Sequence, residues 1–317
     1  MAFREAIKAR LGHAPAWQNL GNVLRDLGRP GEAVDAFWEA LRLAPQSADS
    51  YRQLGAMLAS AGRIDKAIEV HERWLEIFPD DPRAKHFLAA LTQEKVPDRA
   101  SDDYVRTTFD IFAANFDNEL AELEYRAPAL IDEEVARLCG PPQPRMAVLD
   151  AGCGTGLCAP FLRPRASHLA GVDLSPAMIE KAGKRGLFDA LAVEELTAHL
   201  RGHAAMYDLI VSADTLVYFG DLGEVTLAAA RALRPGGAFV FTVERANAED
   251  APAGFRINPH GRYGHTRDYL LRSLTAAGLI GPEIRKVDLR KEADQWVAGW
   301  LCSAKVGQLS VRPNQES

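Results

Sequence analysis

The sequence has few cysteines and no long apolar run, and both shortages narrow the kinds of protein it can encode. Its four cysteines, Cys139, Cys153, Cys158 and Cys302, form no Cys-x-x-Cys pair. That argues against a zinc knuckle and a disulfide framework, and we expect no metal site. No stretch reaches the roughly 18 apolar residues of a membrane span, and the N-terminus lacks the apolar core of a signal peptide. We therefore expect a cytoplasmic protein with no membrane segment.

Basic residues are not in excess either. The chain has 37 lysines and arginines against 43 acidic residues, for a net charge of −6. This balance argues against a nucleic-acid partner. The length of 317 residues predicts two domains, and the hydrophobic content of 47% predicts packed cores.

The first part of the chain repeats. Trp17, Leu20, Gly21, Leu24, Gly28, Ala33 and Pro45 recur as Tyr51, Leu54, Gly55, Leu58, Gly62, Ala67 and Pro79. The period of 34 residues, and the pattern Trp-x-x-Leu-Gly followed by Ala-x-x-x-Phe, resemble the tetratricopeptide repeat. Residues 1–92 are therefore expected to form an all-α solenoid, with Phe3 and Ala6 marking a half-repeat at its start.

Repeats of this kind bury their apolar faces only against neighbours. The solenoid could present a concave surface to a protein or peptide, or it could serve in dimerisation. Both alternatives stay open at this point.

The stretch 148–156, Val-Leu-Asp-Ala-Gly-Cys-Gly-Thr-Gly, organises the rest of the chain. An apolar run reads as a buried strand that ends in Asp150. The glycines that follow let backbone N–H groups approach a ligand closely. The dinucleotide fingerprint would require a third glycine where Leu157 stands. The candidate cofactor-binding residues here are Asp150, Gly152, Cys153, Gly154, Thr155 and Gly156.

A second strand, over residues 169–175, also ends in an acid. Asp173 is placed to accept hydrogen bonds from both hydroxyls of a ribose. Ser175 is expected to cap the next helix. The patterns Asp-x-Gly-x-Gly-x-Gly and Gly-x-Asp-x-Ser-x-x-Met resemble those of class I S-adenosylmethionine-dependent methyltransferases. The resemblance adds Leu174, Ser175 and Met178 to the cofactor-binding candidates.

The third strand, over 191–193, is followed by two acids, and the fourth, over 207–214, ends in one. The resemblance implies that an acid after the third strand contacts the adenine. Glu194 or Glu195 could serve, and Glu195 is preferred. It also places Asp214 near the reacting methyl group and makes Tyr218 a candidate to face the substrate. Leu233-Arg-Pro-Gly-Gly before an apolar strand is a further landmark of the family.

Two segments remain open in function. The helix expected from Tyr104, which carries Phe109, Phe112 and Phe116, could pack on the core or act as a lid over a substrate pocket. If the acceptor needs a base, the candidates are Asp214 and the side chains of a polar loop, His260, Tyr263 and His265.

The resemblance thus implies an α/β fold: a Rossmann-like seven-stranded sheet with helices on both faces, preceded by the tetratricopeptide solenoid. We expect a linker over 93–103, the methyltransferase domain over 104–306 and a polar tail over 307–317. The expected function is transfer of a methyl group from S-adenosylmethionine to an unidentified acceptor, a small molecule or a protein. The alternative is an inactive scaffold that still binds the cofactor.

Overall fold

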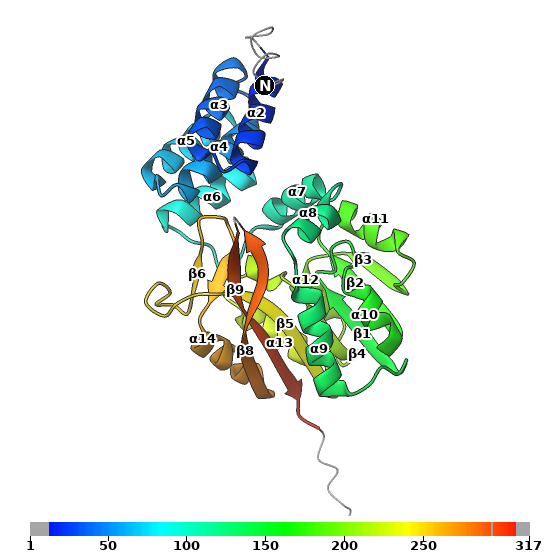
Figure 1. The fold of residues 1–317 in the computed structure, drawn as a ribbon. Helices are drawn as coiled ribbons and strands as arrows, with labels where there is room; N and C mark the ends of the chain where they lie inside the picture. Colours follow the sequence, from blue (N-terminus) through cyan, green and yellow to red (C-terminus); the bar gives the residue numbers. More distant parts are fainter. Residues whose placement is uncertain (1–12, 293, 309–317) are drawn as a thin grey trace, which may run out of the picture. The chain divides into compact units, whose positions relative to one another are not determined.

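The computed structural model describes residues 13–292 and 294–308. The chain divides into two compact units (Figure 1). One contains the residues up to Pro97 together with Ile257–Gly261, and the other contains Asp98–Arg256 and the residues from Arg262 onward. The half-repeat expected around Phe3 and Ala6 lies outside the described residues, as does most of the expected tail over 307–317.

The first unit is entirely helical in its N-terminal part. Its helices are α2 (Ala14–Asp26), α3 (Pro30–Leu43), α4 (Ala48–Ser60), α5 (Ile64–Ile77) and α6 (Pro82–Thr92). Small residues stand where helices approach each other. A Cβ atom added to Gly21 would lie 2.8 Å from the Phe37 ring, and one added to Gly55 would lie 2.1 Å from the His71 ring. The same contact thus occurs in both repeats, and the tetratricopeptide expectation is confirmed.

The first unit also takes in a short segment from much later in the chain. His86 Nε2 donates to the carbonyl oxygen of Gly261 at 2.7 Å. Gln93 Nε2 donates to the carbonyl oxygen of Ile257 at 3.0 Å, and Ile257 is fully buried. Residues 257–261 therefore belong to the helical unit by their contacts, although the residues on both sides of them belong to the other unit.

The second unit is built on a mixed sheet. Its long strands are β1 (Met146–Ala151), β2 (Ala166–Asp173), β3 (Ala190–Val193), β4 (Tyr207–Ser212), β5 (Leu233–Arg245), β8 (Leu279–Glu292) and β9 (Gln295–Val306). They pair in the order β3-β2-β1-β4-β5-β9-β8, with β9 antiparallel to β5 and β8. Two short strands absent from the expected seven, β6 (Phe255–Ile257) and β7 (Tyr263–His265), enlarge the sheet to nine strands.

Helices cover both faces of the sheet, as expected. On one face, α9 (Ala127–Cys139) and α10 (Ala159–Leu162) pack against Val148, Leu209 and Val240. On the other face lie α12 (Leu196–Gly202), α13 (Gly223–Ala232) and α14 (Arg267–Ala276), against alternate strand residues such as Ile210 and Phe239. The Rossmann-like fold class is confirmed. Within the described residues, no helix has the length and apolar character to cross a membrane.

Candidate functional site

A cavity of about 300 Å³ opens at the carboxyl ends of the parallel strands, and residues of the second unit alone line it. β1 pairs with β2 on one side and β4 on the other, so the chain order reverses at this point. Open α/β sheets bind ligands at such reversals. β1 ends one residue after Asp150, because Gly152 adopts a positive φ that a strand does not allow.

The glycine loop after β1 forms the floor of the cavity. Gly152 has a φ of 75°, and a Cβ atom there would lie 2.1 Å from Thr215 Oγ1. Gly156 has a φ of 84° and lies against Phe188. Since other residues avoid positive φ, the loop needs glycine for its backbone shape as well as for space.

Asp173 ends β2 and organises this loop through its carboxylate. Its Oδ2 accepts from the Gly154 N–H and its Oδ1 from the Ser175 N–H, both at 2.9 Å. Burial raises the pKa of Asp173 despite these hydrogen bonds. Ser175 Oγ in turn accepts from the Met178 N–H at 3.1 Å and so caps α11 (Pro176–Lys184), as expected.

Asp150, at the end of β1, is buried with an exposed fraction of 1%. Its Oδ2 has no hydrogen-bond partner among the described residues. Burial, with a smaller contribution from nearby Asp173, raises the pKa of Asp150 to about 7. A buried carboxylate without a partner is costly, and a cation placed beside it would relieve that cost.

The two glutamates after β3 differ in what their side chains do. Both carboxylate oxygens of Glu195 accept backbone N–H groups of α12, from Thr197 at 3.0 Å and Ala198 at 2.8 Å. Glu194 accepts from His199 Nδ1 at 2.8 Å with one oxygen only. Both glutamates line the cavity, but Glu195 is engaged as a helix cap.

A buried network of charges surrounds Asp214, which follows β4 with a φ of 49°. Its Oδ1 accepts from Thr242 Oγ1 at 2.6 Å and its Oδ2 from Arg290 Nη1 at 2.8 Å. Arg290 also donates to Glu244, and to Glu292 at 2.7 Å. Burial raises the pKa of Asp214, and Arg290 opposes that rise. The network holds the Asp214 side chain in one orientation.

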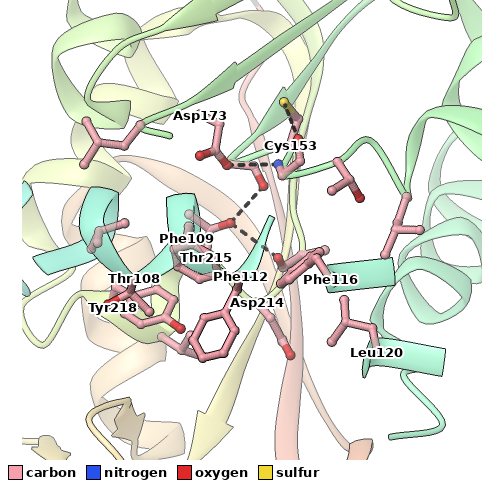
Figure 2. Close-up of a pocket in the computed structure, with 18 of the residues that line it drawn as sticks. Thr108, Phe109, Phe112, Phe116, Leu120, Cys153, Asp173, Asp214, Thr215 and Tyr218 are labelled. Atoms are coloured by element: carbon pink, nitrogen blue, oxygen red, sulfur yellow. Dashed lines mark hydrogen bonds between the residues drawn. The ribbon is translucent and has the colours of Figure 1, made fainter. Parts of the chain in front are cut away.

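Aromatic residues form the other side of the cavity. They come from α7 (Asp102–Phe112) and α8 (Phe116–Glu122). Phe109 packs edge-on against Phe116 at 6.0 Å and against Tyr218 at 5.4 Å between ring centroids. Figure 2 shows Tyr218 and Phe112 at the end of the cavity away from Asp173 and Cys153.

Two aspartates fasten these helices to the cofactor loop and to α11. Asp110 accepts from Ser175 Oγ at 2.5 Å. Asp117 accepts from Thr155 Oγ1 and from Arg185 Nη2, both at 2.5 Å. The α7–α8 segment therefore covers the cavity and does not merely pack elsewhere on the unit.

The comparisons with known families agree with this geometry. The family described as "Methyltransferase domain" matches residues 123–305, more than half of the chain. The chain belongs to this methyltransferase family. The tetratricopeptide repeat family matches residues 2–48 and 19–82. The expected class, a methyltransferase with S-adenosylmethionine as its cofactor, is confirmed together with the repeats.

Curated relatives and solved structures carry related names. A ubiquinone biosynthesis O-methyltransferase of Xanthomonas campestris is 27% identical over 61% of this chain and 86% of its own length. Human methyltransferase-like protein 27 is 44% identical over 27% of this chain, and the chain spans only 35% of that relative.

Among solved structures, the Burkholderia thailandensis 1,6-didemethyltoxoflavin-N1-methyltransferase is 21% identical. It aligns over 68% of this methyltransferase and 93% of its own chain, with a TM-score of 0.50. A Haloferax volcanii complex of the Trm112 methyltransferase activator and a methyltransferase matches at 19% identity, covering 63% and 98%, also with a TM-score of 0.50. At these identities the likeness concerns the fold.

The structure brings most of the predicted cofactor residues of the methyltransferase to one cavity. Those that line it are Asp150, Gly152, Cys153, Gly154, Thr155, Asp173, Leu174, Glu194, Glu195 and Asp214. Gly156, Ser175 and Met178 lie behind this lining, where they shape the loop and cap α11. Of the catalytic candidates, Asp214 and Tyr218 line the cavity.

The three candidates of the polar loop lie elsewhere. His265 is fully buried, donates through Nε2 to the Gly220 carbonyl at 3.0 Å, and has its pKa lowered by burial to about 4. Tyr263 is fully buried, and burial raises its pKa. His260 belongs to the helical unit. None of the three is among the residues that line the cavity, and their role as bases stays a prediction. Short strand β7 turns Tyr263 and His265 into the core.

Sequence reasoning missed the charged wall of the methyltransferase cavity. Arg99, Arg262, Arg290 and Glu292 line it, and Glu244 supports it from behind. They come from separate segments and form no motif. The one available signal was Glu244, a charged residue near the end of the apolar strand β5, because β8 carries charged residues along its whole length.

Proposed function

We propose that this chain transfers the methyl group of S-adenosylmethionine to a small, largely apolar acceptor. The observation that carries the proposal is a single cavity with acids and glycines on one side and aromatic rings on the other. Its volume of about 300 Å³ lies at the low end for ligand pockets. Such a cavity suits the cofactor and a small acceptor that meet under the α7–α8 cover.

The residues present fit the cofactor. The free oxygen of Asp150 suits the ammonium group of the methionine part. Each oxygen of Asp173 accepts one backbone N–H and retains capacity for a ribose hydroxyl. Glu194, whose second oxygen is not engaged by His199, is proposed to contact the adenosine in preference to Glu195. The glycine loop lets the chain come close without a side chain in the way.

The bound cofactor supplies a sulfonium-activated methyl group, and the residues of the chain position the reactants and exclude water. Arg290 and Thr242 hold the Asp214 side chain in one orientation beside the proposed reacting centre. The Tyr218 pKa is raised by burial, so its hydroxyl stays protonated and can donate to an acceptor. The aromatic cover excludes water. Positioning of this kind can supply much of the rate enhancement.

An oxygen nucleophile on a small molecule is favoured by the Xanthomonas relative, which is named as an O-methyltransferase. A protein acceptor is the second candidate, because the tetratricopeptide repeats suit protein recruitment or dimerisation. An inactive scaffold would bind the cofactor and release no S-adenosylhomocysteine with either class of acceptor.

Calorimetric titration with S-adenosylmethionine, S-adenosylhomocysteine and NAD tests the cofactor site. We expect micromolar binding of the first two only, and loss of binding in Asp173→Ala. Asp189→Ala is the matched control, because Asp189 binds Leu169 N and Arg163 away from the cavity. Equal binding by Asp173→Ala and wild type would refute the assignment. Release of S-adenosylhomocysteine with low-mass extract against dialysed protein extract then separates the two acceptor classes.

A further inference from the structure

A chain of hydrogen bonds runs from the cavity into the second unit through His199. Glu194 lines the cavity, and its Oε2 lies 2.8 Å from His199 Nδ1. His199 Nε2 lies 3.1 Å from the Tyr207 hydroxyl. His199 and Tyr207 have exposed fractions of 6% and 2%, so both are shielded from water. Neither lines the cavity.

The chemistry of the three groups fixes the direction of these hydrogen bonds. An ionised carboxylate can only accept hydrogen bonds, so His199 Nδ1 must carry the hydrogen atom that it donates to Glu194. In the neutral ring Nε2 is then an acceptor, and the Tyr207 hydroxyl donates to it. Burial lowers the pKa of His199 more than the Glu194 hydrogen bond raises it, which favours the neutral ring. A tyrosine hydroxyl can donate or accept, so Glu194 sets the tautomer and Tyr207 holds the other ring nitrogen.

Two neighbouring side chains, Glu195 and His203, take no part in this hydrogen-bond chain. Glu195 is occupied by the N–H groups of α12. His203 stacks on His199 at 4.1 Å between ring centroids, but its Nδ1 binds the His199 carbonyl oxygen. The imidazole of His203 therefore supports the ring of His199 without touching Glu194.

We propose that His199 is a positioning residue for the cofactor: it holds the Glu194 carboxylate toward the adenosine, and Tyr207 holds the His199 ring through Nε2. The proposal rests on the proposed function, because it presumes that the cavity binds S-adenosylmethionine. A hydrogen bond to a charged group, once removed, should weaken cofactor binding roughly ten-fold.

Substitutions at His199 separate the hydrogen bond from the packing. His199→Leu removes the donor, and we expect the dissociation constant for S-adenosylmethionine to rise roughly ten-fold. His199→Asn places an amide N–H near the position of Nδ1, so it should retain most of the wild-type affinity. His203→Leu removes the stacked ring but none of the hydrogen-bonded groups of Glu194, His199 and Tyr207. Its affinity for S-adenosylmethionine should stay within about two-fold of the wild type.

Glu194→Ala and Tyr207→Phe give readouts that a merely structural role of His199 would not move. Nitrogen NMR of histidine-labelled protein reports which ring nitrogen carries the proton. In the wild type we expect the Nδ1–H tautomer at His199 at pH 8, with or without cofactor. In Glu194→Ala, which removes the acceptor of Nδ1, we expect a mixture of tautomers at His199. In Tyr207→Phe, which leaves the ring held at one nitrogen only, we expect weaker binding of both S-adenosylmethionine and 5′-methylthioadenosine, which share the adenosine. Circular dichroism checks that each variant folds.

Each result tests either the hydrogen-bond chain of Glu194, His199 and Tyr207 or the proposed function on which it rests. A wild-type His199 protonated at Nε2, a Glu194→Ala variant with unchanged tautomer, or a Tyr207→Phe variant with unchanged affinity would overturn the proposed role of His199. So would equal loss of affinity in His199→Asn and His199→Leu. A wild type with the expected tautomer that binds no S-adenosylmethionine would instead refute the proposed function, while the hydrogen-bond geometry would stand.

Discussion

Replacing Asp150 by asparagine should stabilise the protein without cofactor and abolish its response to the cofactor. Burial, with a smaller effect of Asp173, raises the pKa of Asp150 from 3.8 to about 7. Between these pH values the folded protein keeps a proton that the unfolded chain has lost. The free energy of unfolding therefore falls as the pH rises through this window, and the loss is complete above about pH 7.

The size of the effect follows from the two pKa values. At about 1.4 kcal/mol for each pH unit, ionised Asp150 costs at most about 4 kcal/mol above pH 7. The amide of the substituted side chain carries no charge, so Asp150→Asn should unfold roughly 10 °C higher than the wild type at pH 8. The difference should be less than half as large at pH 5. Differential scanning fluorimetry at both pH values, with and without S-adenosylmethionine, measures it.

The control substitution, Asp189→Asn, should change the stability in the opposite direction. The Leu169 N–H and Arg163 lower the pKa of Asp189, so its ionised form stabilises the fold. Asp189→Asn should therefore lower the unfolding temperature at pH 8. An Asp150→Asn variant that is no more stable than the wild type at pH 8, or whose advantage is equal at pH 5 and pH 8, would show that Asp150 is not strained by burial.

Three further substitutions test other parts of the site. Glu195→Ala should cost about 1 kcal/mol of stability through the lost helix cap, whereas Glu194→Ala should chiefly weaken cofactor binding in calorimetry. Glu244→Ala leaves Arg290 buried with one partner fewer and should cost about 3–5 kcal/mol in urea unfolding. Asp117→Ala loosens the cover, and stopped-flow fluorescence should show S-adenosylhomocysteine leaving several-fold faster.

Surface carboxylates serve as matched controls for these variants. Asp103→Ala, on the exposed side of α7, should leave the release rate unchanged. Glu283→Ala, half exposed on β8, should cost well under 1 kcal/mol. Equal effects in Asp117→Ala and Asp103→Ala would contradict the role of the cover, and a mild Glu244→Ala variant would contradict the network around Arg290.

The parts of the molecule that were predictable from sequence depend on residues close together in the chain. The glycine loop, Asp150 and Asp173 lie within one β-loop-α-β segment, so their spacing in the sequence already predicts that they lie close together. Gly21 and Gly55 could be assigned to helix contacts because the repeat places the same residue at the same position. In each case local geometry and chain order suffice.

The charged wall could not be predicted in this way. Arg290 meets Glu244 only because β9 lies between β5 and β8 in the sheet, and meets Asp214 across the strand ends. The position of the polar loop depends on a distant contact in the same way. His265 looked like a base because it can titrate near neutral pH, but whether it faces a cavity or the core depends on the pairing of β7 with β5.

The choice between Glu194 and Glu195 shows a similar limit. Both follow β3 and both line the cavity. Only the start of α12, two residues further on, makes Glu195 its cap and leaves Glu194 to His199. A boundary that sequence patterns place to within a few residues thus decides which carboxylate caps α12 and which binds His199.

The five residues Ile257–Gly261 affect how this protein can be taken apart or recombined. The chain passes from one unit to the other between 97 and 98, between 256 and 257, and between 261 and 262. A chain begun at Asp98 would leave the carbonyl groups of Gly261 and Ile257 without His86 and Gln93. The repeats are therefore no detachable cassette. An exchange with another methyltransferase would have to carry the five-residue segment along, so the two units are expected to be inherited together.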